Sequence, residues 1–276
     1  MAEKPRQIAV YGKGGIGKST IVQNVSAALV EQGLRVLQVG CDPKHDSSRP
    51  FLAGQAPATI VDLLASDRHE DPSPADFLMQ TSSGVDCIEV GGPKPGVGCA
   101  GAGILTMFDL LEQGRVLSSG YDVVLYDVLG DVVCGGFAAP LRKGHARETV
   151  VVVSGEFMAL YAANNICRGI ATYAQRREVR LAGVVLNCRN VPNEEAVARE
   201  FAARMGGAYL GSIPRDPSVS KAELQRQTVL SAAPDSPQAN AYRQLTDTLL
   251  NNRLLAVPTP LEDRELEEMY FKLAYQ

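Results

Sequence analysis

The sequence has 276 residues, of which 45% are hydrophobic and 21% are charged, as is ordinary for a globular chain with a sizeable core. A formal net charge of −4 argues against broad binding to a phosphate backbone, so we expect no nucleic-acid partner. The chain has no run of about 18 apolar residues and begins without an apolar segment of signal-peptide length. We therefore expect no membrane partner and a cytoplasmic location. Disulfides are rare there, so the six cysteines are interpreted as core residues, reactive thiols or metal ligands.

Apolar runs of strand length alternate with helical patterns along the chain. Several runs are apolar on both faces, which is typical of buried parallel strands joined by crossover helices. We predict a single-domain α/β fold over residues 1–276, with a doubly wound, mainly parallel sheet and helices on both faces. The predicted strands span 7–11, 35–40, 86–90, 122–128, 149–154, 182–187 and 208–213. In the final part, 255–276, Leu266, Met269 and Leu273 stand at helical spacing and predict a peripheral tail helix.

The strongest motif follows the first predicted strand. The stretch "GKGGIGKST" has a glycine, four intervening residues and then Gly-Lys-Ser, which is the pattern of a phosphate-binding loop. Its backbone N–H groups would surround the β-phosphate, Lys18 would reach the β- and γ-oxygens, and Ser19 would bind Mg²⁺. We therefore predict a P-loop NTPase with a nucleoside triphosphate as its ligand. The candidate binding residues of the loop are Gly12, Lys13, Gly14, Gly15, Ile16, Gly17, Lys18, Ser19 and Thr20.

Lys13 directly follows the first glycine of this loop. On the residues alone, a solvated surface charge explains this lysine as well as a functional role does. A lysine at this position resembles the variant phosphate loop of dimeric ATPases, and the resemblance implies that Lys13 reaches the nucleotide of the partner subunit.

Aspartates follow two later predicted strands, at the edge where open α/β sheets bind ligands. Asp42 lies in "GCDPKHDS" and Asp127 lies at the end of an apolar strand in "VVLYDVLGD". Asp46 and Asp131 stand four residues beyond each of them. A carboxylate at such a strand end is typical of the Mg²⁺ site of this class of NTPase, which favours Asp127. Asp46 suits a turn-forming role as well as a catalytic one.

Two cysteines lie in glycine-rich loops, Cys99 in "GGPKPGVGCAGAG" and Cys134 in "DVVCGGFA". Free backbone N–H groups beside a thiolate stabilise it as a metal ligand and tune the reduction potential of a cluster. Two thiolates are too few for a cubane cluster, but a homodimer with a twofold axis through the site would supply four. The spacing alone leaves three interpretations: a [4Fe–4S] cluster bridging two subunits, a Cys₄ zinc site, or structural thiols.

Five stretches, "YGKGGIGKST", "GCDPKHDS", "GGPKPGVGCAG", "YDVLGDVVCGGFA" and "YAANNI", resemble the nitrogenase iron proteins and their nitrogenase-like relatives, and the resemblance covers nearly the whole chain. It implies a homodimeric, ATP-hydrolysing reductase that uses MgATP and MgADP. One [4Fe–4S] cluster per dimer, on Cys99 and Cys134 of each subunit, would pass single electrons to a catalytic metalloprotein, with a ferredoxin or flavodoxin as donor.

The same resemblance assigns roles around the nucleotide. Asp42 to Asp46 would form a first switch and Asp127 to Cys134 a second, in which Asp131 orients the attacking water. The residues that the resemblance implies around the adenine are Asn187, Arg215, Asp216 and Gln238.

The chain departs from nitrogenase iron proteins on the surface expected to face the partner. Ala102 replaces their usual arginine, and in "PLRKGHARE" Arg142 keeps an arginine while His145 stands where a lysine is common. The form "CDPKHDS", with His45, resembles the iron protein of light-independent protochlorophyllide reductase, whereas "SGEFMALYAANNI" is more similar to nitrogenase. Neutral drift of an exposed surface is the alternative explanation.

We therefore expect a nitrogenase-like reductase, with that of methylthio-alkane reductase preferred. A nitrogenase iron protein is second, and the iron protein of a tetrapyrrole reductase is third. ATPases that position septa or plasmids form a different class with the Lys13-type loop. They would need a basic amphipathic helix or a basic face, whereas the tail "LEDRELEEMYFKLAYQ" is acidic.

Overall fold

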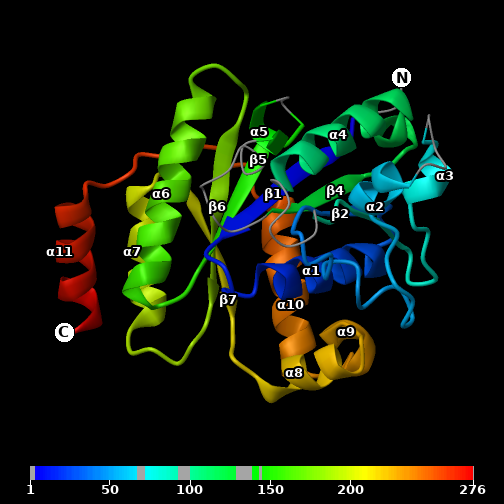
Figure 1. Ribbon diagram of the computed structural model, residues 1–276. Helices are drawn as coiled ribbons and strands as arrows, with labels where there is room; N and C mark the ends of the chain where they lie inside the picture. The colour runs from blue at the N-terminus through cyan, green and yellow to red at the C-terminus, as the bar shows by residue number, and fades with distance from the viewer. Residues whose placement is uncertain (1–3, 67–71, 93–99, 129–138, 143–144, 276) are drawn as a thin grey trace.

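The computed structural model describes residues 4–66, 72–92, 100–128, 139–142 and 145–275. Within them, seven strands form one parallel sheet in the order β3-β2-β4-β1-β5-β6-β7 (Figure 1). The strands are β1 (Arg6–Gly12), β2 (Val36–Gly40), β3 (Val85–Glu89), β4 (Val123–Asp127), β5 (Glu148–Val153), β6 (Arg180–Asn187) and β7 (Ala208–Ile213). The predicted α/β fold with a parallel sheet is confirmed, and no predicted strand bound differs from the observed one by more than two residues.

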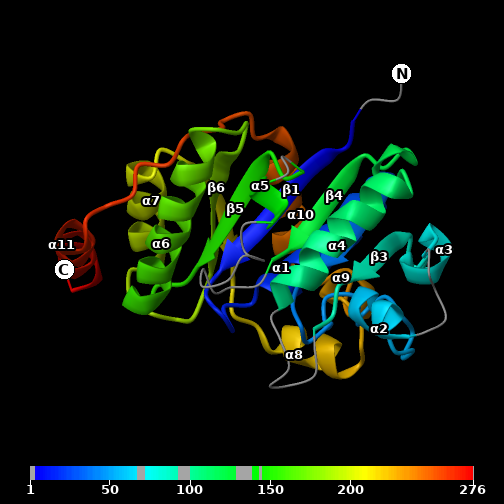
Figure 2. The ribbon, with the colours of Figure 1, turned by 45° about the horizontal axis from the view of Figure 1, so that its top comes forward.

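Helices cover both faces of the sheet, as a doubly wound fold requires (Figure 1). One layer contains α1 (Lys18–Glu31), α8 (Pro217–Leu224), α9 (Val229–Ala232) and α10 (Pro237–Asn251). The other contains α4 (Ala100–Gln113), α5 (Ala139–Arg142), α6 (Phe157–Ala174) and α7 (Glu194–Arg204). The short helices α2 (Ile60–Ala65) and α3 (Pro74–Phe77) lie at the β3 end of the sheet (Figure 2), and the 3-10 helix η1 (Val116–Ser118) follows α4 and contacts it.

The two apolar layers follow from the alternation of side chains along buried strands. In β1, Ile8 and Val10 pack toward α1 and α10, while Ala9 and Tyr11 pack into the layer that contains α4 and α6. Successive side chains of a strand point to opposite faces, so a strand covered on both sides must be apolar throughout. Each fully buried aliphatic side chain contributes roughly 1.5–3 kcal/mol. This burial fixes the sheet that carries the site.

All seven carboxyl strand ends face one edge of the sheet because every strand pair is parallel. The loop after β1 therefore opens beside the end of β4 and the segment after β2 on one side and the segments after β6 and β7 on the other. Ligands of open α/β sheets bind at such an edge, near the strand where the chain changes direction across the sheet. Here that strand is β1.

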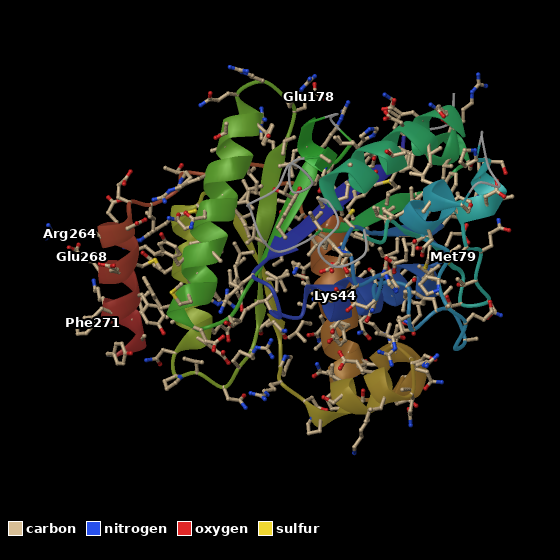
Figure 3. All side chains as sticks on the ribbon, in the orientation of Figure 1. Lys44, Met79, Glu178, Arg264, Glu268 and Phe271 are labelled. Carbon is tan, nitrogen blue, oxygen red and sulfur yellow. The ribbon has the colours of Figure 1, made fainter. Side chains whose placement is uncertain are left out.

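The tail helix α11 (Asp263–Ala274) lies outside α6 and α7 (Figures 1 and 2). Its Leu266 and Met269 are buried against the core, as the spacing predicts. Arg264, Glu268 and Phe271 point away from the body of the protein (Figure 3). Within the described residues, no helix combines the length and the apolar character that a bilayer span requires.

Candidate functional site

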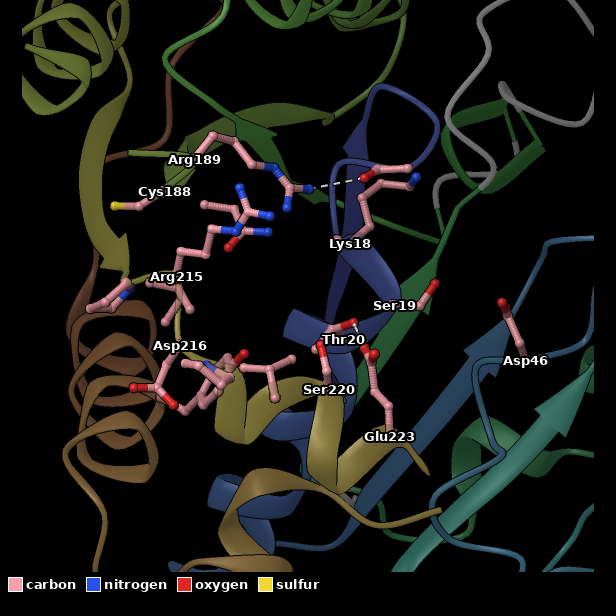
Figure 4. Close-up of a pocket in the computed structure, with 18 of the residues that line it drawn as sticks. Lys18, Ser19, Thr20, Asp46, Cys188, Arg189, Arg215, Asp216, Ser220 and Glu223 are labelled. Carbon is pink, nitrogen blue, oxygen red and sulfur yellow. Dashed lines mark hydrogen bonds between the residues drawn. The ribbon is translucent and has the colours of Figure 1, made fainter. Parts of the chain in front are cut away.

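A cavity of about 950 Å³ opens at the carboxyl edge of the sheet. It lies between the loop after β1, the segment after β2, the ends of β6 and β7, and helices α8 and α10. Lys18 and Ser19 line it from the start of α1, Asp46 from the segment after β2, and Arg189 and Arg215 from the loops after β6 and β7 (Figure 4). The size and the polar lining suit a ligand as large as a nucleotide.

The loop after β1 needs glycine at two positions for different reasons. At Gly12, a Cβ would stand 2.6 Å from the Val152 carbonyl oxygen of the neighbouring strand. Gly17 has φ of 96°, in the left-handed region, and a Cβ there would overlap the side-chain amide of Asn187. The glycine pattern read from the sequence is therefore required by the geometry of the loop.

Two side chains, at the end of β6 and just after it, hold the loop from outside. Asn187 donates from Nδ2 to the Ile16 carbonyl at 2.7 Å. Arg189 donates from Nη2 to the Gly15 carbonyl at 3.0 Å (Figure 4). With these carbonyls engaged, the loop presents backbone N–H groups to an anion. The positive end of α1, which begins at Lys18, adds to this preference for phosphate.

Asp127 ends β4 with its side chain almost completely buried, at 2% exposure. Burial raises the pKa of this carboxyl, while the Ser19 hydroxyl, the Lys18 ammonium and the Ser47 hydroxyl lower it. Its Oδ2 accepts no hydrogen bond from the described residues. A buried carboxylate oxygen without a donor, beside the hydroxyl of Ser19, suits a hard cation such as Mg²⁺, which prefers oxygen ligands. Ser19 and Asp127 therefore fit the predicted metal position.

The segment after β2 brings Asp42 and Asp46 to the same cavity. Asp42 accepts a hydrogen bond from the backbone N–H of Lys44 at 3.0 Å and lies 3.7 Å from the Lys44 ammonium, so it forms the local turn. Asp46 is held through its carbonyl, which accepts from Gln23 Nε2 at 3.0 Å. Its carboxylate lines the cavity and adds negative charge near Asp127, whose pKa it helps to raise.

The side of the cavity assigned to adenine is formed after β7. Arg215 and Asp216 line it, and Asp216 caps α8 by accepting from the Ser218 N–H at 2.7 Å. The hydroxyl and N–H of Ser218 lower the pKa of Asp216. Gln238 does not line the cavity, because it is buried behind it and donates to the Pro214 carbonyl at 3.0 Å. It supports the cavity wall without facing the cavity.

The cavity thus collects most of the predicted nucleotide residues. Lys13 is exposed and does not line it, so its predicted contact with a partner subunit stays a prediction. Sequence reasoning missed several lining residues. Arg189 could have been found because it follows a predicted strand end, but Glu223 and Tyr242 carry no sequence signal. Glu223 accepts from the Thr20 hydroxyl at 2.8 Å, which joins α8 to the start of α1.

Cys99, Cys134 and Asp131 lie outside the described residues, and their roles stay predictions. Cys99 directly precedes α4, and Cys134 stands seven residues after Asp127. Within the described part of the chain, no group of three or more His, Cys, Asp or Glu side chains could hold a metal ion. The four cysteines described there are Cys41, Cys87 and Cys167, which are buried, and Cys188, which is half-buried.

His145 is not on the surface, contrary to the expectation from the sequence. The residue is 7% exposed, and its ring stacks on Phe108 with a centroid distance of 4.3 Å and places Nε2 3.0 Å from Glu112. The imidazole packs against Phe108 on the apolar face of α4. A comparison of charged residues between sequences does not reveal such a contact. His145 is therefore not evidence for a changed docking surface.

Comparison with known proteins places the chain in a family. The model of the 4Fe-4S iron sulfur cluster binding proteins, NifH/frxC family, matches residues 6–275. The nitrogenase iron protein of Methanospirillum hungatei JF-1 is 49% identical over 266 residues, which cover 96% of this chain and 94% of that protein. The resemblance predicted from the motifs is confirmed.

Solved structures with the same fold include two cell division proteins. The cell division ATPase MinD of Pyrococcus furiosus aligns with a TM-score of 0.71 at 20% identity, over 91% of this chain and 99% of that chain. The septum site-determining protein MinD of Pyrococcus horikoshii OT3, solved complexed with Mg-ADP, aligns with a TM-score of 0.72 at 21% identity, over 90% and 96% of the two chains. At these identities the likeness shows the fold alone, whereas the match over residues 6–275 and the 49% identity show that the chain belongs to the NifH/frxC family of 4Fe-4S iron–sulfur cluster binding proteins.

Proposed function

We propose that the chain is the ATP-dependent reductase component of a nitrogenase-like enzyme. Two copies form a homodimer that holds one [4Fe–4S] cluster on Cys99 and Cys134 of each subunit, and each copy binds MgATP. The dimer delivers single electrons to a separate catalytic metalloprotein and accepts them from a ferredoxin or flavodoxin. Membership of an iron–sulfur cluster binding family supports the cluster, and the cavity at the phosphate loop supports the nucleotide.

The observation that carries this proposal is the position of Asp127. Its buried carboxylate lies beside Ser19 and Lys18 at the phosphate loop, and it begins the segment "DVLGDVVC", which ends at Cys134. One short segment therefore connects the metal position of the nucleotide site to a cluster ligand. A change at the γ-phosphate could reach the cluster through this segment, in the way that switch loops respond to hydrolysis in other NTPases.

Each residue of the site has a task in this scheme. Lys18 and the loop N–H groups hold the phosphates, Ser19 and Asp127 hold Mg²⁺, and Asp131 orients the attacking water. Around the base, Asn187, Arg215 and Asp216 line the cavity while Gln238 supports its wall. Lys13 reaches the nucleotide of the partner subunit. The cluster, when bound, supplies one-electron transfer.

The catalytic component that we favour is that of methylthio-alkane reductase, which cleaves C–S bonds in small thioethers. Ala102 supports this preference. It is exposed in the first turn of α4, three residues after Cys99, and has no charge to offer a partner. Because the arginine usual in nitrogenase iron proteins is missing, neither its partner contact nor its ADP-ribosylation can take place here.

A nitrogenase iron protein proper is the second candidate. The 49% identity to the nitrogenase iron protein of Methanospirillum hungatei supports it. The iron protein of a tetrapyrrole reductase is third, supported by the His45 form of the first switch.

Reconstitution with purified catalytic components separates the candidates. The anaerobically purified protein is mixed with MgATP, dithionite and the catalytic component of methylthio-alkane reductase, of nitrogenase or of protochlorophyllide reductase. We expect thiol release from a thioether in the first mixture and little turnover in the others. Ammonia formation in the second mixture, without thiol release in the first, would replace our assignment by the runner-up. The Ala102→Arg variant then tests whether this position selects the partner.

A further inference from the structure

Gln38 is a polar side chain in an apolar layer. It stands in the centre of β2, between Cys87 of β3 and Leu125 of β4, and is 1% exposed. It lines neither the cavity nor any other site described above. A buried amide is costly unless its hydrogen-bonding groups are paired, so its partners indicate what it is for.

The amide of Gln38 is fully paired. Ser26 of α1 donates from Oγ to Gln38 Oε1 at 2.7 Å. Gln38 Nε2 in turn lies 2.8 Å from both the carbonyl oxygen and the hydroxyl oxygen of Ser47 and donates to each. The reversed amide would bring Oε1 against the Ser47 carbonyl oxygen, so this orientation is fixed.

Ser47 belongs to the segment that carries Asp46 into the cavity. Its carbonyl also accepts from Gln23 Nε2 at 3.0 Å, and the N–H of the following Ser48 donates to Glu89 Oε1 at 2.6 Å. Three side chains from α1, β2 and β3 thus hold this segment from behind, and none of the three lines the cavity. Of these three side chains, Gln38 is the one that donates to the Ser47 hydroxyl.

The Ser47 hydroxyl connects this network to the metal position. Because its oxygen accepts the Gln38 N–H, its own hydrogen points elsewhere. Ser47 lies near the buried Asp127 carboxylate, because it is among the groups that lower the Asp127 pKa. Hydrogen bonds therefore run from Ser26 through Gln38 to Ser47, the residue that follows Asp46 and lies near Asp127.

We propose that Gln38 is a positioning residue for the Mg²⁺–nucleotide site. By holding both polar oxygens of Ser47, it sets the place of the segment that brings Asp46 into the cavity beside the metal position. Gln38 does not touch the nucleotide and acts through Ser47. This inference rests on the proposed function, because it requires that Asp127 and Ser19 hold Mg²⁺ with a bound nucleotide.

Nucleotide binding by the Gln38→Met variant tests this proposal. Met has a similar length and no hydrogen-bonding amide, so it releases Ser47 and keeps the layer apolar. The dissociation constant of a non-hydrolysable ATP analogue is measured by calorimetry on the anaerobically purified dimer, once with Mg²⁺ and once with EDTA. The constant in EDTA should stay within about twofold of wild type, because the phosphate loop and Lys18 are intact. The tightening produced by Mg²⁺ should shrink about three- to tenfold, as expected for the loss of one or two hydrogen bonds.

A double variant separates positioning from stability. Gln38→Met leaves the Ser26 hydroxyl buried and unpaired, whereas Ser26→Ala with Gln38→Met removes both partners and should restore the unfolding midpoint. The loss of Mg²⁺-dependent tightening should persist in this double variant, because Ser47 is still released. Ser47→Ala removes only the hydroxyl contact and should show part of this loss, and adding Gln38→Met, which also frees the Ser47 carbonyl, should bring the loss to that of Gln38→Met alone.

The possible outcomes are distinct. If the double variant regains both its stability and wild-type tightening by Mg²⁺, Gln38 is only a structural residue and the inference is overturned. Wild-type tightening in Gln38→Met itself would overturn it too. If the wild-type dimer binds no nucleotide under any of these conditions, the proposed function has failed and the inference falls with it.

Discussion

Asn187 joins the end of β6 to the phosphate loop, since its side-chain amide donates to the Ile16 carbonyl at 2.7 Å and occupies the space that a side chain on Gly17 would need. A residue expected near the adenine therefore also shapes the phosphate site. The loop backbone and the base side of the cavity are built as one unit.

Substitution of Gly17 tests this coupling. In Gly17→Ala the left-handed conformation costs about 1–2 kcal/mol, and the new methyl group displaces Asn187 from the loop. Gly33→Ala is the matched control, because Gly33 has φ of 82° but a Cβ there meets no atom within 4 Å. Both variants should unfold earlier in denaturant, while only Gly17→Ala loses nucleotide affinity in a calorimetric titration. Equal affinity in both variants would contradict the role of Asn187.

Lys18 carries a positive charge close to Asp127 and is buried, with 7% of the residue exposed. The Lys18→Gln variant should lose ATP hydrolysis and ATP-driven electron transfer by at least about 100-fold, because it no longer stabilises charge on the phosphates. The fold and the cluster should remain. Lys221→Gln, on the exposed face of α8, controls for the loss of one charge. Turnover with the catalytic component by Lys18→Gln at the wild-type rate would show that the phosphate-loop assignment is wrong.

Glu89 should make the free energy of unfolding depend on pH. It is 1% exposed at the end of β3, and burial raises its pKa from 4.5 to about 8, with the charges of Asp127 and Asp46 acting in the same direction. The folded state therefore keeps this carboxyl protonated at neutral pH, while the unfolded chain ionises it above about pH 4.5. The contribution of Glu89 to the free energy of unfolding is therefore complete below about pH 4.5 and is lost as the pH rises toward 8.

Between these limits Glu89 should lower the free energy of unfolding by about 1.4 kcal/mol per pH unit. Denaturant unfolding of wild type and of Glu89→Gln at pH 5, 6, 7 and 8 measures this slope. The difference between the slopes of the two proteins isolates the contribution of Glu89 from that of the other groups, including Asp127, whose pKa is raised as well. Parallel curves for the two proteins would mean that Glu89 is ionised in the folded state.

The cluster assignment is tested by iron content. Cys99→Ala and Cys134→Ala should each abolish cluster assembly and leave nucleotide binding measurable. Cys87→Ala and Cys167→Ala change buried thiols in β3 and α6 and should keep the cluster, with a modest loss of stability. About four irons per dimer in either of the first two variants would refute that ligand set.

The sequence predicted the elements whose signal is local. Strands such as β4 and β5 could be found because a strand buried on both faces is a continuous apolar run, and the phosphate loop could be found because its glycine spacing is contained in nine residues. The positions of Lys18 and Asp127 next to each other follow from the parallel order of β1 and β4. For the same reason, the cavity could be expected at the carboxyl edge of the sheet, where the structure has it.

The remaining parts depend on contacts between distant segments. Gln38 appears in the sequence as one polar residue in a strand, and only the fold brings Ser47 against it. Glu223 reaches Thr20 because α8 returns across the cavity, and Gln238 was assigned to the base although it lies behind Pro214. His145 was interpreted as a surface residue, because stacking on Phe108 leaves no mark in a sequence.

The central claim is a homodimer that shares one cluster and binds MgATP. It is tested most directly by measuring molar mass and iron in the same anaerobic sample, with visible absorbance followed during chelation with and without MgATP. We predict two chains with about four irons, and chelation that speeds up when MgATP is bound. A single chain without iron would contradict the account.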